Sequence, residues 1–157
     1  MIVLTWILAF LAAFVATNLP LGPVYASLHP DFVALLVLYW AIGGNGSLGY
    51  TLVWGIGLLQ DLILGDLLGA HAMGLVLMLF LLYLGLARVR RLPPWEQLFF
   101  IFLLLLAERF VVWLWQGWTT PVRWHWALLV APAFGAALWP LWTSLLDRVF
   151  QRQTRRG

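Results

Sequence analysis

The chain has 157 residues, 64% of them hydrophobic and only 10% charged, with a formal net charge of +3. Soluble domains of this size carry far more charge, so the composition excludes a soluble domain and indicates an integral membrane protein. There is no cysteine, which excludes both a disulfide framework and a thiolate metal site.

Six apolar segments predict an all-α membrane protein with six transmembrane helices. A hydrocarbon core about 30 Å thick needs about 20 helical residues, with roughly 17–25 tolerated. The predicted spans cover residues 2–19, 31–43, 47–64, 71–88, 94–118 and 125–148. Only short loops separate them, so we expect one membrane domain over residues 1–157. The first segment lacks a basic start and a small-residue cleavage site, so we expect a retained helix.

Arginines predict the orientation of these spans. All nine basic residues are arginines, and seven of them follow the fourth or the sixth span: Arg88, Arg90, Arg91, Arg148, Arg152, Arg155 and Arg156. Loops rich in arginine stay on the cytoplasmic side, so both termini are predicted to be cytoplasmic. This distribution favours a topology signal over a nucleic-acid-binding patch, and we expect no nucleic-acid partner.

Local signals predict where several helices begin or bend. Asp31 follows a proline and precedes an apolar run, so its carboxylate is expected to cap the second helix. Pro94 is expected to open the fifth helix in its first turn, where its missing N–H costs nothing. Pro132 and Pro140 interrupt the sixth segment and predict a bent helix.

Three ionisable residues lie inside predicted spans: Asp61, Glu108 and Arg109. Charges at membrane depth usually face the bundle interior and pair with one another, or mark a functional site. Asp61 and Arg109 each lie about 21 Å from the inner boundary at 1.5 Å per residue. Equal depth predicts an Asp61–Arg109 pair between helices, either structural or functional. Glu108 is then turned about 100° away, toward another partner or water.

The third span carries small residues at four-residue intervals. Gly57, Asp61, Gly65 and Gly69 would share one face wherever the segment is helical. Such a face lets another backbone approach closely. It predicts packing against another helix of the same chain or, alternatively, docking of a partner.

No catalytic constellation is present, so we expect no enzyme. The three histidines are far apart in sequence, and no nucleophile stands in a recognised motif. We expect no metal site, although one built from His29, His71 and Asp66 stays open. The tryptophans between residues 113 and 126 are typical of an interfacial aromatic belt, with a ligand site as the alternative.

A set of motif residues resembles the bacterial rod shape-determining protein family MreD. A proline followed by aspartate or asparagine opens a leucine-rich helix that ends in Tyr-Trp, and a G-x-x-x-D-L-x-x-G-x-x-x-G element follows. Trp139-Pro140 lies in the last span, as in that family. The matching residues of the first two elements are Pro30, Asp31, Tyr39, Trp40, Gly57, Asp61, Leu62, Gly65 and Gly69.

The resemblance implies a non-enzymatic, multi-pass protein of the bacterial inner membrane without a cofactor. Members bind MreC and connect MreB filaments to RodA and a class B penicillin-binding transpeptidase, which organises lateral peptidoglycan synthesis. The fold is expected to be similar to substrate-binding subunits of energy-coupling-factor transporters. The alternative function is such a vitamin-type carrier subunit, with Asp61 and the outer tryptophans lining a pocket.

Overall fold

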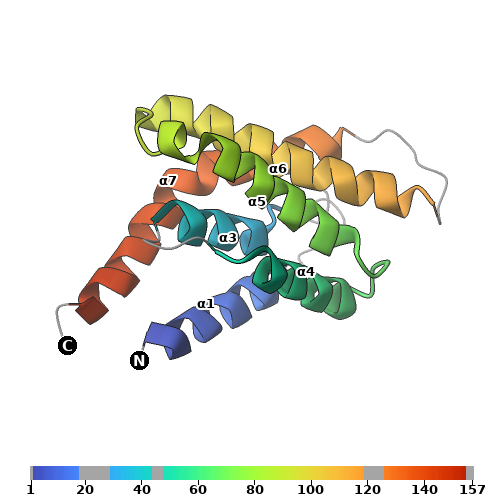
Figure 1. Cartoon of the computed structure of the whole chain (residues 1–157), viewed down its shortest axis with the longest axis horizontal. Helices are drawn as coiled ribbons and strands as arrows, with labels where there is room; N and C mark the ends of the chain where they lie inside the picture. The colour runs from blue at the N-terminus through green and yellow to red at the C-terminus, as the bar shows by residue number, and fades with distance from the viewer. Residues whose placement is uncertain (1, 18–28, 44–47, 119–125, 155–157) are drawn as a thin grey trace.

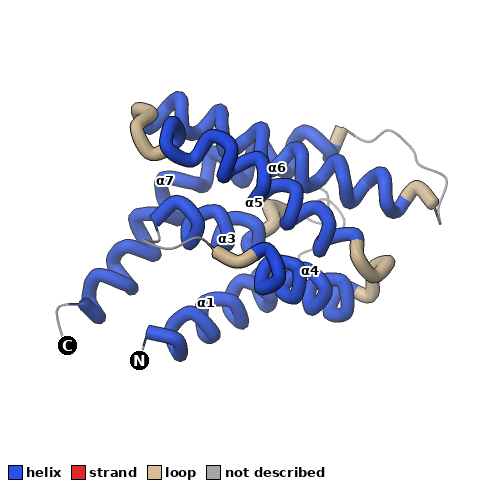
Figure 2. The backbone as a smooth tube through the Cα atoms, in the orientation of Figure 1, coloured by secondary structure: helices blue, strands red, loops and turns tan. Residues whose placement is uncertain are grey.

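The computed structural model describes residues 2–17, 29–43, 48–118 and 126–154. These residues form six helices and no strand (Figure 2). An all-α fold is therefore confirmed, and a helix occupies each of the six predicted regions. The helices, labelled as in Figure 1, are α1 (Ile2–Thr17), α3 (Phe32–Gly43), α4 (Tyr50–Leu64), α5 (Ala70–Val89), α6 (Pro94–Gln116) and α7 (Ala127–Thr154).

Three helices are long and apolar enough to cross a membrane. Their spanning parts are Ala70–Val89, Trp95–Gln116 and Leu128–Phe150. The described parts of α1, α3 and α4 are apolar but have 10–17 residues. Three such segments in a chain of this composition identify a membrane protein. The crossing by the other three helices and the single-domain organisation stay predictions.

The shortest helix, α3, lies at the centre of the bundle. Seven of its 12 residues are buried, and they face every direction around the helix axis. Helices α1, α5 and α7 all pack against it. A helix that is apolar on all sides is stable only when neighbours cover it, which explains why the sequence of α3 lacks a polar stripe.

Helix starts follow the local signals. The Oδ1 atom of Asp31 accepts hydrogen bonds from the backbone N–H groups of Val33 at 2.9 Å and Ala34 at 3.0 Å. The predicted cap of α3 is therefore confirmed. Pro94 stands in the first turn of α6, as predicted.

Helix α7 contains two prolines, Pro132 and Pro140, and changes direction along its course (Figure 1). Each proline removes one backbone hydrogen bond from the helix. The hydroxyl groups of Thr143 and Ser144 donate to the carbonyls of Pro140 and Leu141, at 3.1 and 2.8 Å. Proline and such side-chain bonds are established causes of helix bending.

The start of α1 and the end of α7 meet at one end of the bundle. The Trp6 ring stacks on Trp40 with centroids 4.4 Å apart and lies 4.3 Å from the ring of Phe150. The Arg90 side chain, at the end of α5, donates to the Ile42 carbonyl at the end of α3. Arg88, Arg90 and Arg91 thus lie at the same end of the bundle as Arg148, while Arg155 and Arg156 fall outside the described residues.

Candidate functional site

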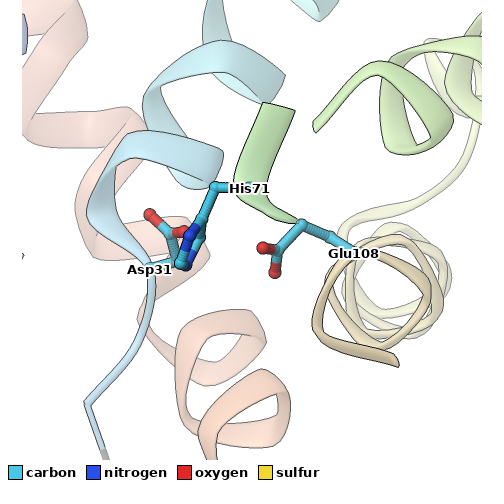
Figure 3. A group of neighbouring side chains, drawn as sticks. All are labelled: Asp31, His71 and Glu108. Carbon is cyan, nitrogen blue, oxygen red and sulfur yellow. The ribbon is translucent and has the colours of Figure 1, made fainter. Parts of the chain in front are cut away.

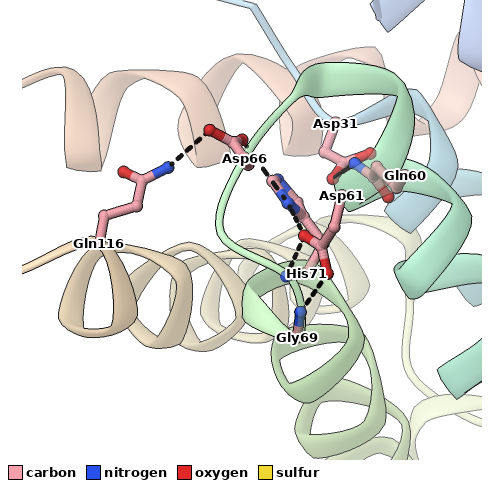
Figure 4. A network of polar contacts seen from close by, with 7 residues as sticks. All are labelled: Asp31, Gln60, Asp61, Asp66, Gly69, His71 and Gln116. Carbon is pink, nitrogen blue, oxygen red and sulfur yellow. Dashed lines mark hydrogen bonds and ion pairs between the residues drawn. The ribbon is translucent and has the colours of Figure 1, made fainter. Parts of the chain in front are cut away.

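Asp61 lies in the last turn of α4 and is fully buried. Its carboxylate accepts hydrogen bonds from the backbone N–H groups of Gly69 at 2.8 Å and His71 at 2.9 Å (Figure 4). It also contacts Nδ1 of His71 at 2.8 Å. Because the first N–H groups of a helix lack partners within that helix, Asp61 caps α5 from the preceding helix.

Glycines form the turn that brings α4 and α5 together. Gly65 ends α4 with φ of 69°, and Gly69 precedes α5 with φ of 97°. Both values lie in the left-handed region that glycine adopts without strain. Within α4, a Cβ atom on Gly57 would lie 2.3 Å from Cα of Ala72. Only glycine permits this approach of the two backbones.

The four-residue pattern therefore does not form one continuous helix face. Helix α4 ends at Leu64, so Gly65 and Gly69 are turn residues, whereas Gly57 and Asp61 face α5. The positive φ angles at both glycines end the helical geometry, so the shared face covers only Gly57 and Asp61. At Gly57 the close packing is with another helix of the same chain.

The expected Asp61–Arg109 pair is wrong. Asp61 contacts His71 and Gly69 instead, and an Arg109 guanidinium nitrogen donates to the backbone carbonyl of His29 at 3.4 Å. Consecutive residues of a helix differ by 100° in direction, so Glu108 and Arg109 cannot both point at Asp61. In α6 the residue that faces the interior is Glu108, with 1% of its surface exposed.

Five polar side chains meet in the interior and are termed the buried polar cluster: Asp31, Gln60, Asp61, His71 and Glu108. Ligand atoms of Asp31, His71 and Glu108 all lie within 4.8 Å of one another (Figure 3). The side-chain amide of Gln60 donates to Oδ2 of Asp31 at 2.7 Å. The cluster thus joins the start of α3, the end of α4, the start of α5 and the middle of α6.

Asp66 stands at the rim of the cluster, about one-third exposed. One of its oxygens lies 3.9 Å from Nδ1 of His71, and Gln116 donates to the other at 3.5 Å (Figure 4). These longer contacts connect the α4–α5 turn with the end of α6. The sequence left open a metal site built from His29, His71 and Asp66. In the structure Asp66 and His71 approach each other, whereas His29 contacts the carbonyl of Pro30 and accepts a hydrogen bond from Arg109.

Sequence reasoning missed the partnership of Asp61 with His71. The available signal was the start of α5: an acidic residue ending one helix, two glycines, and a histidine in the first turn of the next. Gln60 was missed because a single uncharged amide inside an apolar helix gives no sign of its partner in the sequence. Its burial beside Asp31 follows only from the packing of α3 against the other helices.

Comparisons with known proteins agree along the whole chain. The sequence model of one family, described as rod shape-determining protein MreD, matches residues 1–149. The chain belongs to the MreD family. It is also 30% identical over 148 residues to the rod shape-determining protein MreD of Haemophilus influenzae, covering 93% of this chain and 90% of that protein. No solved structure matches.

Membership in the MreD family gives the chain a role in rod shape determination. The motif by which the sequence resembles this family runs from Gly57 to Gly69. In this MreD-family chain, those residues build a helical hairpin: one glycine for close approach, one carboxylate for the cap and two glycines for the turn.

Proposed function

We propose that this chain is a non-enzymatic membrane scaffold of the cell-elongation complex. It binds MreC directly, and through MreC it works with MreB, RodA and a class B penicillin-binding transpeptidase to organise lateral peptidoglycan synthesis. The observation that carries this proposal is the match to a shape-determining family over residues 1–149. The proposal includes six membrane crossings in the bacterial inner membrane and both termini in the cytoplasm. The similarity to energy-coupling-factor subunits stays a prediction.

The outward face of α4 is our candidate surface for MreC. Gly57 and Asp61 are occupied by α5, so a partner helix needs the opposite side of α4. On that side Gly55 has open space around it, and the neighbouring side chains of Leu52, Leu59 and Leu62 are exposed.

These four residues follow spacings of three, four and three, which is the spacing of a helix–helix seam. A glycine within such a seam lets a second transmembrane helix approach closely, and dispersion contacts then stabilise the pair in lipid. The rest of the seam supplies three leucines for those contacts. This geometry suits a single transmembrane helix of a partner better than a soluble domain.

A co-purification experiment tests the proposal. Tagged chain and MreC are co-expressed, reconstituted in nanodiscs and quantified by mass, with Gly55→Leu as the test variant. Ala137→Leu is the matched control, because it places the same side chain at an exposed position of α7. We expect a stoichiometric complex for wild type and control, and at least a tenfold loss for Gly55→Leu.

Two results would count against it. If the folded wild-type chain does not retain MreC, direct binding is wrong. If Gly55→Leu retains MreC as well as the wild type does, the interface lies on another face. A cell-shape assay with the same variants, combined with the amount of each variant in the membrane by immunoblot, separates loss of MreC binding from loss of protein.

A further inference from the structure

We propose that Asp31, His71 and Glu108 form a binding site for one divalent transition-metal ion. The three residues come from separate helices, and their ligand atoms lie within 4.8 Å of one another (Figure 3). At most 7% of the surface of each is exposed. Two carboxylates and one imidazole are a ligand set used for zinc and manganese in proteins.

Unpartnered atoms in the cluster point to a ligand. Among the described residues, Oε1 of Glu108 and Oε1 of Gln60 are buried without a hydrogen-bond partner. A buried acceptor left without a partner is costly, and more so when it is charged. The Glu108 carboxylate extends from α6 toward Asp31 and His71 (Figure 3). A cation at that position would satisfy it.

The hydrogen bonds around His71 prepare one ring nitrogen to bind a metal. Both oxygens of Asp61 already accept backbone N–H groups, so we assign Nδ1 of His71 as the donor to Asp61. The lone pair is then on Nε2, which is the atom left for a metal. Histidine ligands in metalloproteins usually donate their other nitrogen to a carboxylate in this way.

Asp31 is oriented in the same manner. Its Oδ1 accepts the N–H groups of Val33 and Ala34, and its Oδ2 accepts the amide of Gln60. The two bonds to Oδ1 use both of its lone pairs, whereas Oδ2 keeps one lone pair for a metal ion, and together the three bonds fix the direction of the carboxylate. Oriented ligands supported by further hydrogen bonds distinguish a built site from a chance meeting of acidic groups.

Charge balance favours a divalent cation. Asp31, Asp61 and Glu108 place three carboxylates in a region that lies within the bundle, where unbalanced charge is costly. Arg109 follows Glu108 in sequence, but its guanidinium contacts the carbonyl of His29. A divalent ion bound by Asp31 and Glu108 would neutralise both and hold α3, α5 and α6 together.

The geometry needs only a small closure of the side chains. Zinc bonds to oxygen and nitrogen are about 2.0–2.1 Å, so ligand atoms around a tetrahedral ion lie about 3.3 Å apart. Rotation about the side-chain bonds of the three residues would bring their ligand atoms to this distance. The fourth position is available to the unpartnered oxygen of Gln60 or to a water molecule.

Metal content of the purified protein is the direct test. Protein carrying a tag without histidine is dialysed in detergent against Zn²⁺ or Mn²⁺, and bound metal is measured by inductively coupled plasma mass spectrometry. We expect about one ion per chain in the wild type. Glu108→Gln should weaken binding at least tenfold, because it removes a ligand. Glu96→Gln is the matched control, since it makes the same change at the start of α6.

Thermal unfolding, followed by tryptophan fluorescence, verifies that the variants are folded. With a chelator, Glu108→Gln should unfold at or above the temperature of the wild type, because the variant lacks a buried charge. Added Zn²⁺ should raise the unfolding temperature of the wild type and of Glu96→Gln only. The proposal is overturned if the wild type binds neither metal, or if Glu108→Gln binds as much as the wild type.

X-ray absorption on the metal-loaded wild type supplies a test that needs no variant. One imidazole ligand with oxygen ligands is expected. Two or more imidazoles would indicate adventitious binding that involves other histidines and would refute the site.

Discussion

Replacing Gly57 with alanine should separate α4 from α5. The added Cβ atom would lie 2.3 Å from Cα and 2.6 Å from N of Ala72, and 2.9 Å from the carbonyl carbon of His71. All three are backbone atoms, so no side chain can rotate to make room. An ordinary contact needs about 3.5 Å, so the helices must move apart by about 1 Å.

The magnitude of the destabilisation follows from two costs and one gain. Overpacking of this kind costs about 1–3 kcal/mol. A shift of about 1 Å also lengthens the bonds from Asp61 to Gly69 and His71, now 2.8 and 2.9 Å, beyond hydrogen-bond range. Loss of a helix cap costs about 0.5–2 kcal/mol. Alanine is about 1 kcal/mol better than glycine inside a helix, which offsets part of these costs. We therefore expect Gly57→Ala to destabilise the protein by about 0.5–4 kcal/mol.

Unfolding in mixed detergent micelles with increasing sodium dodecyl sulfate, followed by tryptophan fluorescence, measures this loss. The matched control is Gly55→Ala, two residues away in α4, where nothing lies within 4 Å of an added Cβ atom. Alanine is about 1 kcal/mol better than glycine inside a helix, so the control should be as stable as wild type or more stable. Equal stability of Gly57→Ala and Gly55→Ala would refute the close approach of the two backbones.

Two double-mutant cycles check other contacts by the same unfolding measurement. Asp61→Ala with His71→Ala should show a coupling of about 1–2 kcal/mol. Asp61→Ala with Arg109→Ala should be additive within about 0.5 kcal/mol. Coupling in the second cycle alone would support the Asp61–Arg109 pair and contradict the structure. Tyr39→Phe removes a 2.7 Å bond to the exposed carboxylate of Asp147 and should cost about 0.5–1 kcal/mol. In an Asp147→Ala background the loss should be smaller, and an equal loss would show that the phenol acts elsewhere.

The sequence was sufficient for features that depend on local rules. Apolar length predicted the helical regions, Asp31 predicted the start of α3, and Pro94 predicted the first turn of α6. Each depends on residues within one or two turns of each other, where spacing determines geometry. The position of α3 at the centre was not predicted, because an apolar helix can face either lipid or protein.

Helix rotation was the quantity that the sequence did not supply. Depth along the membrane can be counted at 1.5 Å per residue, and this count placed Asp61 at the same depth as the neighbouring residues Glu108 and Arg109. Choosing which neighbour faces inward needs the rotation of α6, and an error of one residue is 100°. Glu108 faces the interior because its face of α6 carries the buried residues Ile101, Leu104, Leu105 and Val112.

The motif between Gly57 and Gly69 changes meaning once these rotations are known. As a sequence it resembles a surface for a partner helix, yet its atoms are used inside the chain to join α4 and α5. A substitution at Gly57 or Asp61 that abolishes rod shape would therefore act through loss of the hairpin and would not identify a binding face. Substitutions at Gly55 avoid that ambiguity, because this position lies on the same helix and has no neighbour to disturb. The pair Gly55 and Gly57 thus separates folding from partner binding within three residues of sequence.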